Sequence, residues 1–191
     1  DSTDTRRDVT CAPYNINQDF SLVARNIQTM VDGKFRRDWT NQVASAAQYF
    51  GMNWPMIRLS DVLLMFAETE NELNNGPTPA AKEAFERVRL RAFAGNAALI
   101  GTTPSDKAGF FNAIVKERAL EFVGEMLRKQ DLIRWNLLDA KLAENKTKLE
   151  QLENRTGVYA NLPTKIYYST NADGETLNIY GLNFGDTDAI G

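Results

Sequence analysis

The chain has 191 residues, 43% hydrophobic and 25% charged, with 22 Lys and Arg against 25 Asp and Glu and a net charge of −3. These values are typical of about one folded domain, and no apolar run approaches the roughly 20 residues that a membrane-spanning helix needs. The charge balance, without a dense basic stripe, argues against a nucleic-acid partner. One cysteine and no histidine exclude an intramolecular disulfide, a Cys/His zinc site and histidine-dependent nucleophilic catalysis.

The first 55 residues are predicted to be rich in loops. Residues 1–20 are polar and irregular, and Pro13 would break a helix, so we expect a loop with an extended stretch at residues 14–20. Asp32 and Gly33 form a turn signal of the kind that joins two strands. A long structured loop is expected over residues 35–54, where aromatic side chains cluster: Phe35, Trp39, Tyr49, Phe50 and Trp54.

A helical hairpin is predicted next. Residues 56–74 place apolar side chains at helical spacing until Asn-Asn-Gly-Pro stops the helix. Thr78 is expected to cap a second helix, which has Pro79 at its first position and ends near Gly95. The hairpin has about the size of a tetratricopeptide repeat, whose period is roughly 34 residues. Because repeat arrays need about three units to bury their faces, we expect further helices to cover this one.

Residues 110–135 are predicted to form a mostly buried helix, with Ser105 as a cap before it. The apolar residues are three and four apart, at Phe111, Ile114, Val115, Ala119, Phe122, Val123 and Met126. The opposite side carries charges that we expect to pair along the surface: Lys116, Glu117, Arg118, Glu121, Glu125 and Arg128. Trp135 continues the burial pattern and is expected in the core.

The last third of the chain is predicted to change from helix to strand. Residues 137–154 keep leucines at helical spacing with charges between them. Two β-branched and aromatic runs, residues 165–168 and 177–180, flank Asp173-Gly174 and predict a β-hairpin. The expected fold class is mainly α, with one helical hairpin, long loops and a small C-terminal β-hairpin.

The run ERALEFVGEMLRKQDLIRW at residues 117–135 resembles the C-terminal motif of the SusD/RagB family. Matching positions are Glu117, Arg118, Glu121, Phe122, Glu125, Arg128, Asp131, Leu132, Ile133, Arg134 and Trp135. Met126 stands where the family has Gly, and methionine favours a continuous helix over a bend. Earlier segments also resemble the family: residues 4–7, and in the hairpin Arg58, Asp61, Ala67, Glu68, Asn71, Glu72, Val88, Arg89 and Arg91. The Ile-Pro-x-x-Glu segment that often ends the family has no match after Asn136.

The resemblance implies a single C-terminal domain over residues 1–191. It would contain a loop-rich segment at 1–55, a helical core at 56–154 and a β-hairpin with a tail at 155–191. It implies an outer-membrane lipoprotein, exposed at the surface of a Bacteroidetes cell, that binds oligosaccharide or another nutrient without catalysis. A SusC-like TonB-dependent transporter is the implied partner. No cofactor is expected, and the family's lipid anchor is expected to lie outside these residues.

Residues 35–54 supply the side chains that sugar binding needs. Flat aromatic rings pack against sugar rings, and amide groups bind the hydroxyls. We therefore predict ligand contacts from Trp39, Tyr49, Trp54, Asn41, Gln48 and Asn53. Packing in the core is the competing interpretation. It is the stronger one for Trp54, which lies next to a helix start, whereas Trp39 and Tyr49 fit either interpretation.

Two other functions stay open. A helical-repeat scaffold could contact the transporter or a partner subunit without binding sugar, and an exposed apolar patch on the hairpin would favour it. A glycoside hydrolase would need two carboxylates facing each other at about 5–9.5 Å. Glu117, Glu121 and Glu125 are one helical turn apart, but nearby arginine and lysine side chains favour surface or interhelix ion pairs instead. Four acidic residues could offer oxygen ligands to calcium: Asp173, Glu175, Asp186 and Asp188. They lack the full spacing of a calcium-binding loop, so we predict no metal site there.

Overall fold

The structure is a computed structural model that describes residues 3–12, 14–17, 19, 21–24, 31–36, 39, 53–162, 167–170, 172 and 177–180. The chain divides into two compact units, Asp1–Gly124 and Glu125–Gly191, and each is described by itself. The predicted division into segments 1–55, 56–154 and 155–191 of one domain stays a prediction.

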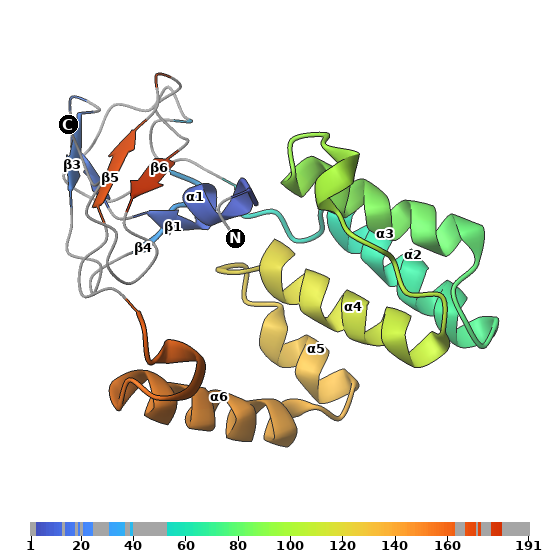
Figure 1. The fold of residues 1–191 in the computed structure, drawn as a ribbon. Coiled ribbons are helices and arrows are strands. Elements are labelled where there is room, and N and C mark those ends of the chain that lie inside the picture. The colour runs from blue at the N-terminus through green and yellow to red at the C-terminus, as the bar shows by residue number, and fades with distance from the viewer. Residues whose placement is uncertain are drawn as a thin grey trace. The chain divides into compact units, whose positions relative to one another are not determined.

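The predicted helical hairpin is present in the first unit (Figure 1). It consists of α2 (Leu59–Leu73) and α3 (Pro79–Ala92), which pack against each other. The Thr78 hydroxyl accepts a hydrogen bond from the Ala81 N–H at 3.1 Å, and Pro79 occupies the first turn, where its missing N–H costs nothing. The start signal predicted from the sequence is therefore confirmed.

A third helix, α4 (Lys107–Glu121), packs against α2 and completes the core of the unit. Asp106, rather than the predicted Ser105, caps it, because the Asp106 carboxylate accepts from the Gly109 N–H at 2.8 Å. The ring of Phe85 on α3 meets that of Phe110 on α4 edge to face, with centroids 5.3 Å apart. The largest fully buried side chains come from all three helices: Phe85, Phe110, Leu64, Ile114, Glu121 and Asn71.

α2 is apolar on two sides. Leu64 and Ala67 are fully buried against the neighbouring helices. Another stripe at helical spacing is solvent-exposed, comprising Leu59 at 61%, Val62 at 48%, Phe66 at 44% and Leu73 at 76% exposure. A helix at a protein surface normally has one apolar stripe, which faces the core, so α2 carries a second stripe that the described residues leave uncovered.

The start of the chain is more ordered than the predicted loop. Residues Arg6–Thr10 form a short helix, α1, and the Asp4 carboxylate accepts from the Arg6 N–H at its start. Two small antiparallel pairs follow: β1 (Cys11–Ala12) with β4 (Val31–Asp32), and β2 (Tyr14–Ile16) with β3 (Leu22–Ala24). The predicted extended stretch is thus confirmed for residues 14–16.

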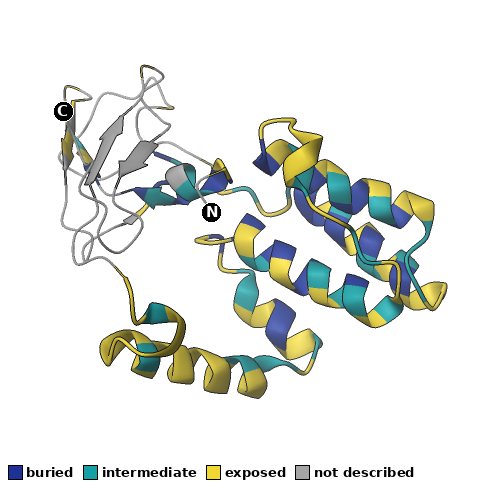
Figure 2. Ribbon diagram, viewed as in Figure 1, coloured by how far each residue is buried: buried dark blue, intermediate teal, exposed yellow. Residues whose placement is uncertain are grey.

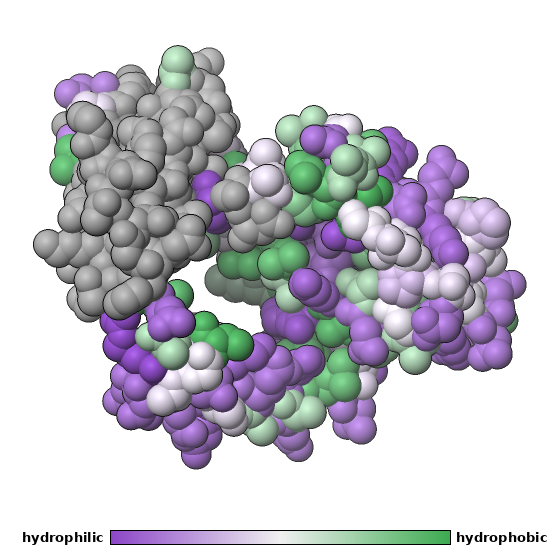
Figure 3. Space-filling model, viewed as in Figure 1, coloured by the Kyte–Doolittle hydropathy of each residue, from purple (hydrophilic) through white to green (hydrophobic). Residues whose placement is uncertain are grey.

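The second unit contains α5 (Arg128–Arg134), α6 (Leu138–Glu153) and an antiparallel hairpin of β5 (Tyr167–Thr170) and β6 (Leu177–Tyr180). This hairpin confirms the prediction from residues 165–180. α6, described over its whole length, buries no residue, and its visible face is mostly hydrophilic (Figures 2 and 3). Trp135 is only partly buried, with the Arg134 guanidinium 4.4 Å from its ring centroid, so its expected place in the core is wrong.

The helical stretch predicted over residues 110–135 is divided in two, because α4 ends at Glu121 and α5 begins at Arg128. The family's bend, which the methionine at position 126 puts in question, is therefore present. Between them Gly124 has φ +79°, and a Cβ there would overlap the Asp32 carboxylate. Met126 has φ +62° and is 84% exposed, so the chain bends despite the methionine. Val123 is 44% exposed, so neither Val123 nor Met126 is part of the buried stripe that the apolar spacing predicts.

The mainly helical fold class predicted from the sequence is confirmed. Two short 3₁₀ turns, η3 (Ala97–Leu99) and η4 (Gly157–Tyr159), add to the helices among the described residues. None of the helices in the described residues has both the length and the apolarity that crossing a membrane requires.

Replacing Met126 with glycine should stabilise the protein by about 1 kcal/mol, the usual penalty for a residue with a Cβ in a left-handed backbone conformation. Glycine adopts that conformation easily, and the exposed methionine side chain contributes little packing. The midpoint of urea unfolding measures the change. Met126→Ala is the control, because alanine keeps the Cβ; an equal gain in that variant would contradict the explanation.

Candidate functional site

A cluster of ions around a buried carboxylate joins α1, the start of α2, α3 and α4; its outermost member, Arg91, is exposed. We call it the ion cluster, and it comprises Asp4, Arg6, Arg58, Arg91, Glu117 and Glu121. Glu121 lies at its centre and is 1% exposed. The Glu121 carboxylate accepts from Arg91 at 2.6 Å, from Arg58 at 3.0 Å and from Arg6 at 3.1 Å. Three arginines from three different segments thus share one carboxylate.

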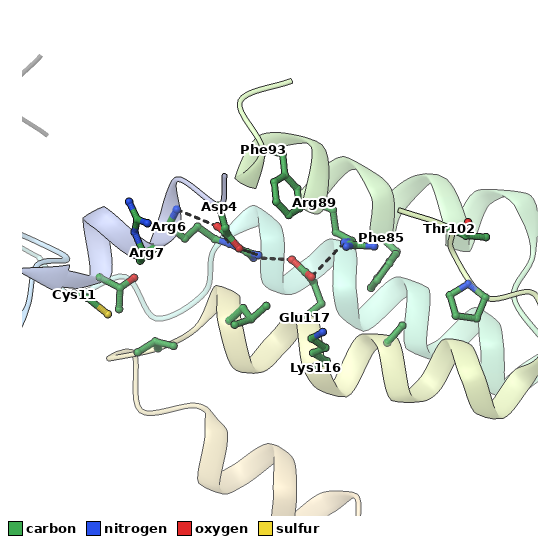
Figure 4. Close-up of a pocket in the computed structure, with 15 residues that line it drawn as sticks. Asp4, Arg6, Arg7, Cys11, Phe85, Arg89, Phe93, Thr102, Lys116 and Glu117 are labelled. Atoms are coloured by element: carbon green, nitrogen blue, oxygen red, sulfur yellow. Dashed lines mark hydrogen bonds and ion pairs between the residues drawn. The ribbon is translucent and has the colours of Figure 1, made fainter. Parts of the chain in front are cut away.

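Arg6 connects the start of the chain to this cluster (Figure 4). Its guanidinium binds Asp4 at 2.7 Å and Glu117 at 2.6 Å, so Asp4, Arg6 and Glu117 form a continuous row from α1 to α4. The Thr5 N–H and hydroxyl both donate to the Ala92 carbonyl, at 2.9 and 3.0 Å. These contacts hold α1 against the C-terminal end of α3.

A second buried ion pair lies beside the cluster. Arg118 donates to Asp61 at 2.7 Å, joining α4 to α2. The guanidinium groups of Arg118 and Arg58 lie 4.8 and 5.0 Å from the ring centroid of Phe122, which is the geometry of cation–π contacts. The motif that begins at Glu117 therefore contributes charged and aromatic groups to a single buried contact region.

Of the surface or interhelix ion pairs that the sequence favours for the charges of α4, the structure has the interhelix kind. Glu117, Arg118, Glu121 and Glu125 are 1–7% exposed, and the first three bind partners on other elements. Arginines occupy the carboxylate oxygens of Glu117 and Glu121, which contradicts the hydrolase interpretation of this pair. Surface pairs within one helix do form on α6, where Glu144 binds Lys141 and Lys148.

The pKa values of two carboxyl groups in the cluster are shifted in opposite directions. Burial raises the pKa of Glu117 above its ordinary value, and the charges of Arg6 and Arg89 only partly offset this. Burial also acts on Glu121, but the charges of Arg91 and Arg58 and the hydrogen bonds from Arg58 and Arg6 outweigh it and lower the pKa of Glu121. Ionisation is therefore favoured at the centre of the cluster and opposed at Glu117.

A turn at residues 33–36, the aromatic turn, lies against the C-terminal end of α4. The Lys34 Nζ donates to the Glu121 carbonyl at 2.7 Å, and cations are favoured at such helix ends. The Gly33 N–H donates to the Thr10 carbonyl at 2.9 Å, and a Cβ on Gly33 would collide with the Val9 carbonyl oxygen. Only glycine allows this close approach.

Two consecutive residues of the aromatic turn each contact one tryptophan ring. Phe35 contacts Trp54, with ring centroids 4.9 Å apart. The Arg36 guanidinium lies 5.0 Å from the ring centroid of Trp39 and 5.6 Å from that of Tyr14. Arg36 is itself buried and donates to the Gly33 carbonyl at 3.0 Å and to the Val9 carbonyl at 3.2 Å. Both tryptophan rings are therefore positioned by an anchored segment.

The structure describes half of the predicted ligand-binding residues. Trp39 is 46% exposed and Trp54 is 49% exposed, so the expectation that Trp54 mainly packs in the core is wrong. Asn53 is exposed next to Trp54. Asn41, Gln48 and Tyr49 lie outside the described residues, as do the four acidic candidates for calcium. Ligand binding by all six stays a prediction. The sequence reasoning missed Arg36, because its role depends on contacts with Val9 and Tyr14.

Replacing Glu121 with glutamine should destabilise the protein by about 3 kcal/mol, because arginines would lose a buried counter-charge. Urea unfolding at neutral pH measures the loss. Glu144→Gln is the matched control: the Glu144 pKa is lowered to about 2 by Lys141 and Lys148, yet exposed pairs contribute little to stability. Equal effects of the two substitutions would show that the buried cluster has no special role.

Replacing Glu117 with glutamine should lower the free energy of unfolding by less than replacing Glu121 does. This loss should become smaller as the pH rises from about 5 to about 7. Because the folded protein raises the pKa of Glu117, it binds that proton more tightly than the unfolded chain does. The wild-type protein therefore loses stability as the pH rises from about 4.5 through the folded pKa. Urea unfolding at both pH values checks this, and a growing cost would contradict the direction of the shift.

Known proteins resemble this chain over parts of their length. SusD-like protein P25 of Formosa agariphila is 48% identical over 85 residues, which cover 44% of this chain and 15% of that protein. A crystal structure of a SusD homolog from Bacteroides thetaiotaomicron aligns with a TM-score of 0.57 at 24% identity. That alignment covers 74% of this chain and 32% of the solved chain, and it shows a common fold.

The sequence profile of the SusD family extends the match through most of the chain. It covers residues 13–176, which includes the hairpin, the motif at residues 117–135 and the segment after Asn136, where the sequence alone shows no family signature. The resemblance stated from the motif is thereby confirmed, and the chain belongs to the SusD family.

Proposed function

We propose that this chain is part of a cell-surface protein that binds oligosaccharide or another nutrient without catalysis and delivers it to a SusC-like TonB-dependent transporter. Membership of the SusD family supports a role in nutrient uptake. The same membership supports placing the full-length protein at the outer membrane as a lipoprotein. The chain spans under a third of the solved relative, so other parts of the protein would share these roles.

The pair of exposed tryptophans that the aromatic turn contacts is the observation that carries the proposal. Trp39 and Trp54 each leave about half of their surface in solvent. Each is in contact with a turn residue on one side, through Arg36 or Phe35. A ring that is fixed before binding loses little conformational entropy when a ligand packs on it. This combination of exposure and anchoring suits an aromatic platform for sugar rings.

Polar groups beside the platform fit the same role. Asn53 precedes Trp54 and is exposed, which makes its amide available for sugar hydroxyls. The sequence between the two tryptophans adds Asn41, Gln48 and Tyr49 as predicted contacts. In contrast, the carboxylates on α4 are engaged by arginines, which supports binding without catalysis.

A titration of the 191-residue chain with a panel of neutral oligosaccharides, followed by tryptophan fluorescence, tests the proposal. Saturable quenching is expected, with affinity reduced at least about tenfold in Trp39→Ala, because the stacking of a sugar ring on the indole is lost. Trp135→Phe is the matched control. It removes the third tryptophan, whose ring contacts Arg134 at the end of α5, and should leave the affinity unchanged.

The exposed stripe of α2 favours an alternative function, that of a helical-repeat scaffold for protein contacts. Its four apolar residues, at 44–76% exposure, form the kind of surface that a transporter or partner subunit would cover. The titration separates the two functions. A folded chain that shows no saturable quenching at millimolar sugar would contradict sugar binding by this part and favour the scaffold.

A further inference from the structure

Phe35 has an unusual backbone conformation for its residue type. Its φ is +57°, in the left-handed region, where a Cβ is disfavoured and a bulky side chain is rare. Four other described residues with positive φ directly follow the C-terminal cap of a helix, a place where this conformation ends the helix: Asn75, Ala94, Asn136 and Arg155. Phe35 follows β4 rather than a helix, so its conformation needs another explanation.

The neighbours of Phe35 hold this conformation from both sides. Before it, the Lys34 Nζ donates to the Glu121 carbonyl at the end of α4 at 2.7 Å. After it, the buried Arg36 guanidinium donates to the Val9 carbonyl on α1 at 3.2 Å. A strained residue persists where surrounding contacts determine its conformation. Because these contacts come from distant parts of the chain, the fold rather than local preference fixes Phe35.

The conformation brings the ring of Phe35 against that of Trp54. The ring centroids are 4.9 Å apart and the planes are tilted by 45°. Residues 53–58, which include Trp54, form no helix or strand, and Met56 and Ile57 in this stretch are exposed. Among the described residues Phe35 supplies the only aromatic contact of Trp54. The exposed indole therefore depends on Phe35 for a fixed orientation.

We propose that Phe35 is a positioning residue of the aromatic platform, the pair Trp39 and Trp54. Its strained conformation places the ring that fixes Trp54 in the orientation in which a sugar ring stacks on the indole. The proposal rests on the proposed binding function and names the residue that prepares one of the two rings for it. An indole that is ordered in advance loses less conformational entropy on binding. Backbone strain at Phe35 is then a cost in stability that serves the function of the site.

A positioning role differs from simple packing in its effect on stability. A residue that only packs would lower stability when replaced, and binding would weaken because less of the chain is folded. A positioning residue in a strained conformation behaves differently, because replacing it relieves the strain while it releases the indole. Affinity should then fall although the protein remains about equally stable.

Titration of the whole chain with neutral oligosaccharides, followed by tryptophan fluorescence, compares Phe35→Asn with Phe35→Tyr. Asparagine tolerates the left-handed conformation but has no ring, whereas tyrosine keeps both the ring and the strain. Phe35→Asn should weaken binding about threefold to tenfold. The factor should be the same for every sugar that binds, because the disorder of Trp54 is a property of the free protein. Phe35→Tyr should retain the wild-type affinity.

The fluorescence anisotropy of Trp54 without ligand measures its order directly. The chain has three tryptophans, so Trp54 is alone after Trp39→Phe and Trp135→Phe. In this background Phe35→Asn should lower the anisotropy, and Phe35→Tyr should leave it unchanged. The midpoint of urea unfolding should change little in Phe35→Asn, because relief of the strain offsets the loss of a half-buried ring. A large loss of stability would assign Phe35 to the core and overturn the proposal.

Met126→Asn is the matched control. Met126 has φ +62° and belongs to the second unit, so the substitution relieves a similar strain without removing a ring that contacts Trp54. The anisotropy of Trp54 and the affinity for oligosaccharides should stay unchanged. An equal loss of affinity in Met126→Asn would show that relaxing the backbone, rather than removing the ring, weakens binding, and would overturn the role of Phe35.

The role of Phe35 and the proposed function can fail separately. Saturable quenching in the wild type with unchanged affinity in Phe35→Asn would overturn the role of Phe35 and leave sugar binding intact. Unchanged anisotropy of Trp54 in Phe35→Asn would overturn that role as well. No saturable quenching in the wild type, together with lower anisotropy in Phe35→Asn, would overturn sugar binding at the platform while supporting Phe35 as the residue that orders Trp54.

Discussion

The Glu121 carboxylate is the interaction on which the first unit depends. It is almost fully buried and binds arginines from α1, α3 and the segment before α2, so those elements must all be in place for its charge to be compensated. An unpaired ion in this position would cost several kcal/mol. The carbonyl of the same residue accepts from Lys34 and Arg58, so this helix end also anchors the aromatic turn. Glu121 therefore contributes both to the stability of the first unit and to the placement of the candidate platform.

Local sequence signals predicted the helices well and the burial of charge poorly. Thr78, Pro79 and the apolar spacing of α2 and α3 act within a few residues, and the hairpin follows from them. The partners of Glu121 are 30, 63 and 115 residues away, and no periodicity on α4 can indicate them. The bend at Met126 is a similar case. Helix propensity favoured continuity, but the close approach of Gly124 to Asp32 fixes the turn.

The candidate site was predictable in part, because composition alone drew attention to Trp39 and Trp54. Their exposure depends on what packs beside them, and the turn residues Phe35 and Arg36 decide that. Arg36 has no local signal, since its carbonyl and aromatic contacts include Val9 and Tyr14, more than twenty residues away.

The 115-residue separation between Arg6 and Glu121 has a consequence for how the chain folds. At a synthesis rate of about 5–20 residues per second, the start of the chain waits roughly 6–23 seconds before α4 is complete. During that time Asp4 and Arg6 can bind each other, but neither can be buried at its native position. Contacts this distant in sequence also slow folding, because the loop must close before they form. The N-terminal segment is thus expected to dock last, onto helices that have already assembled.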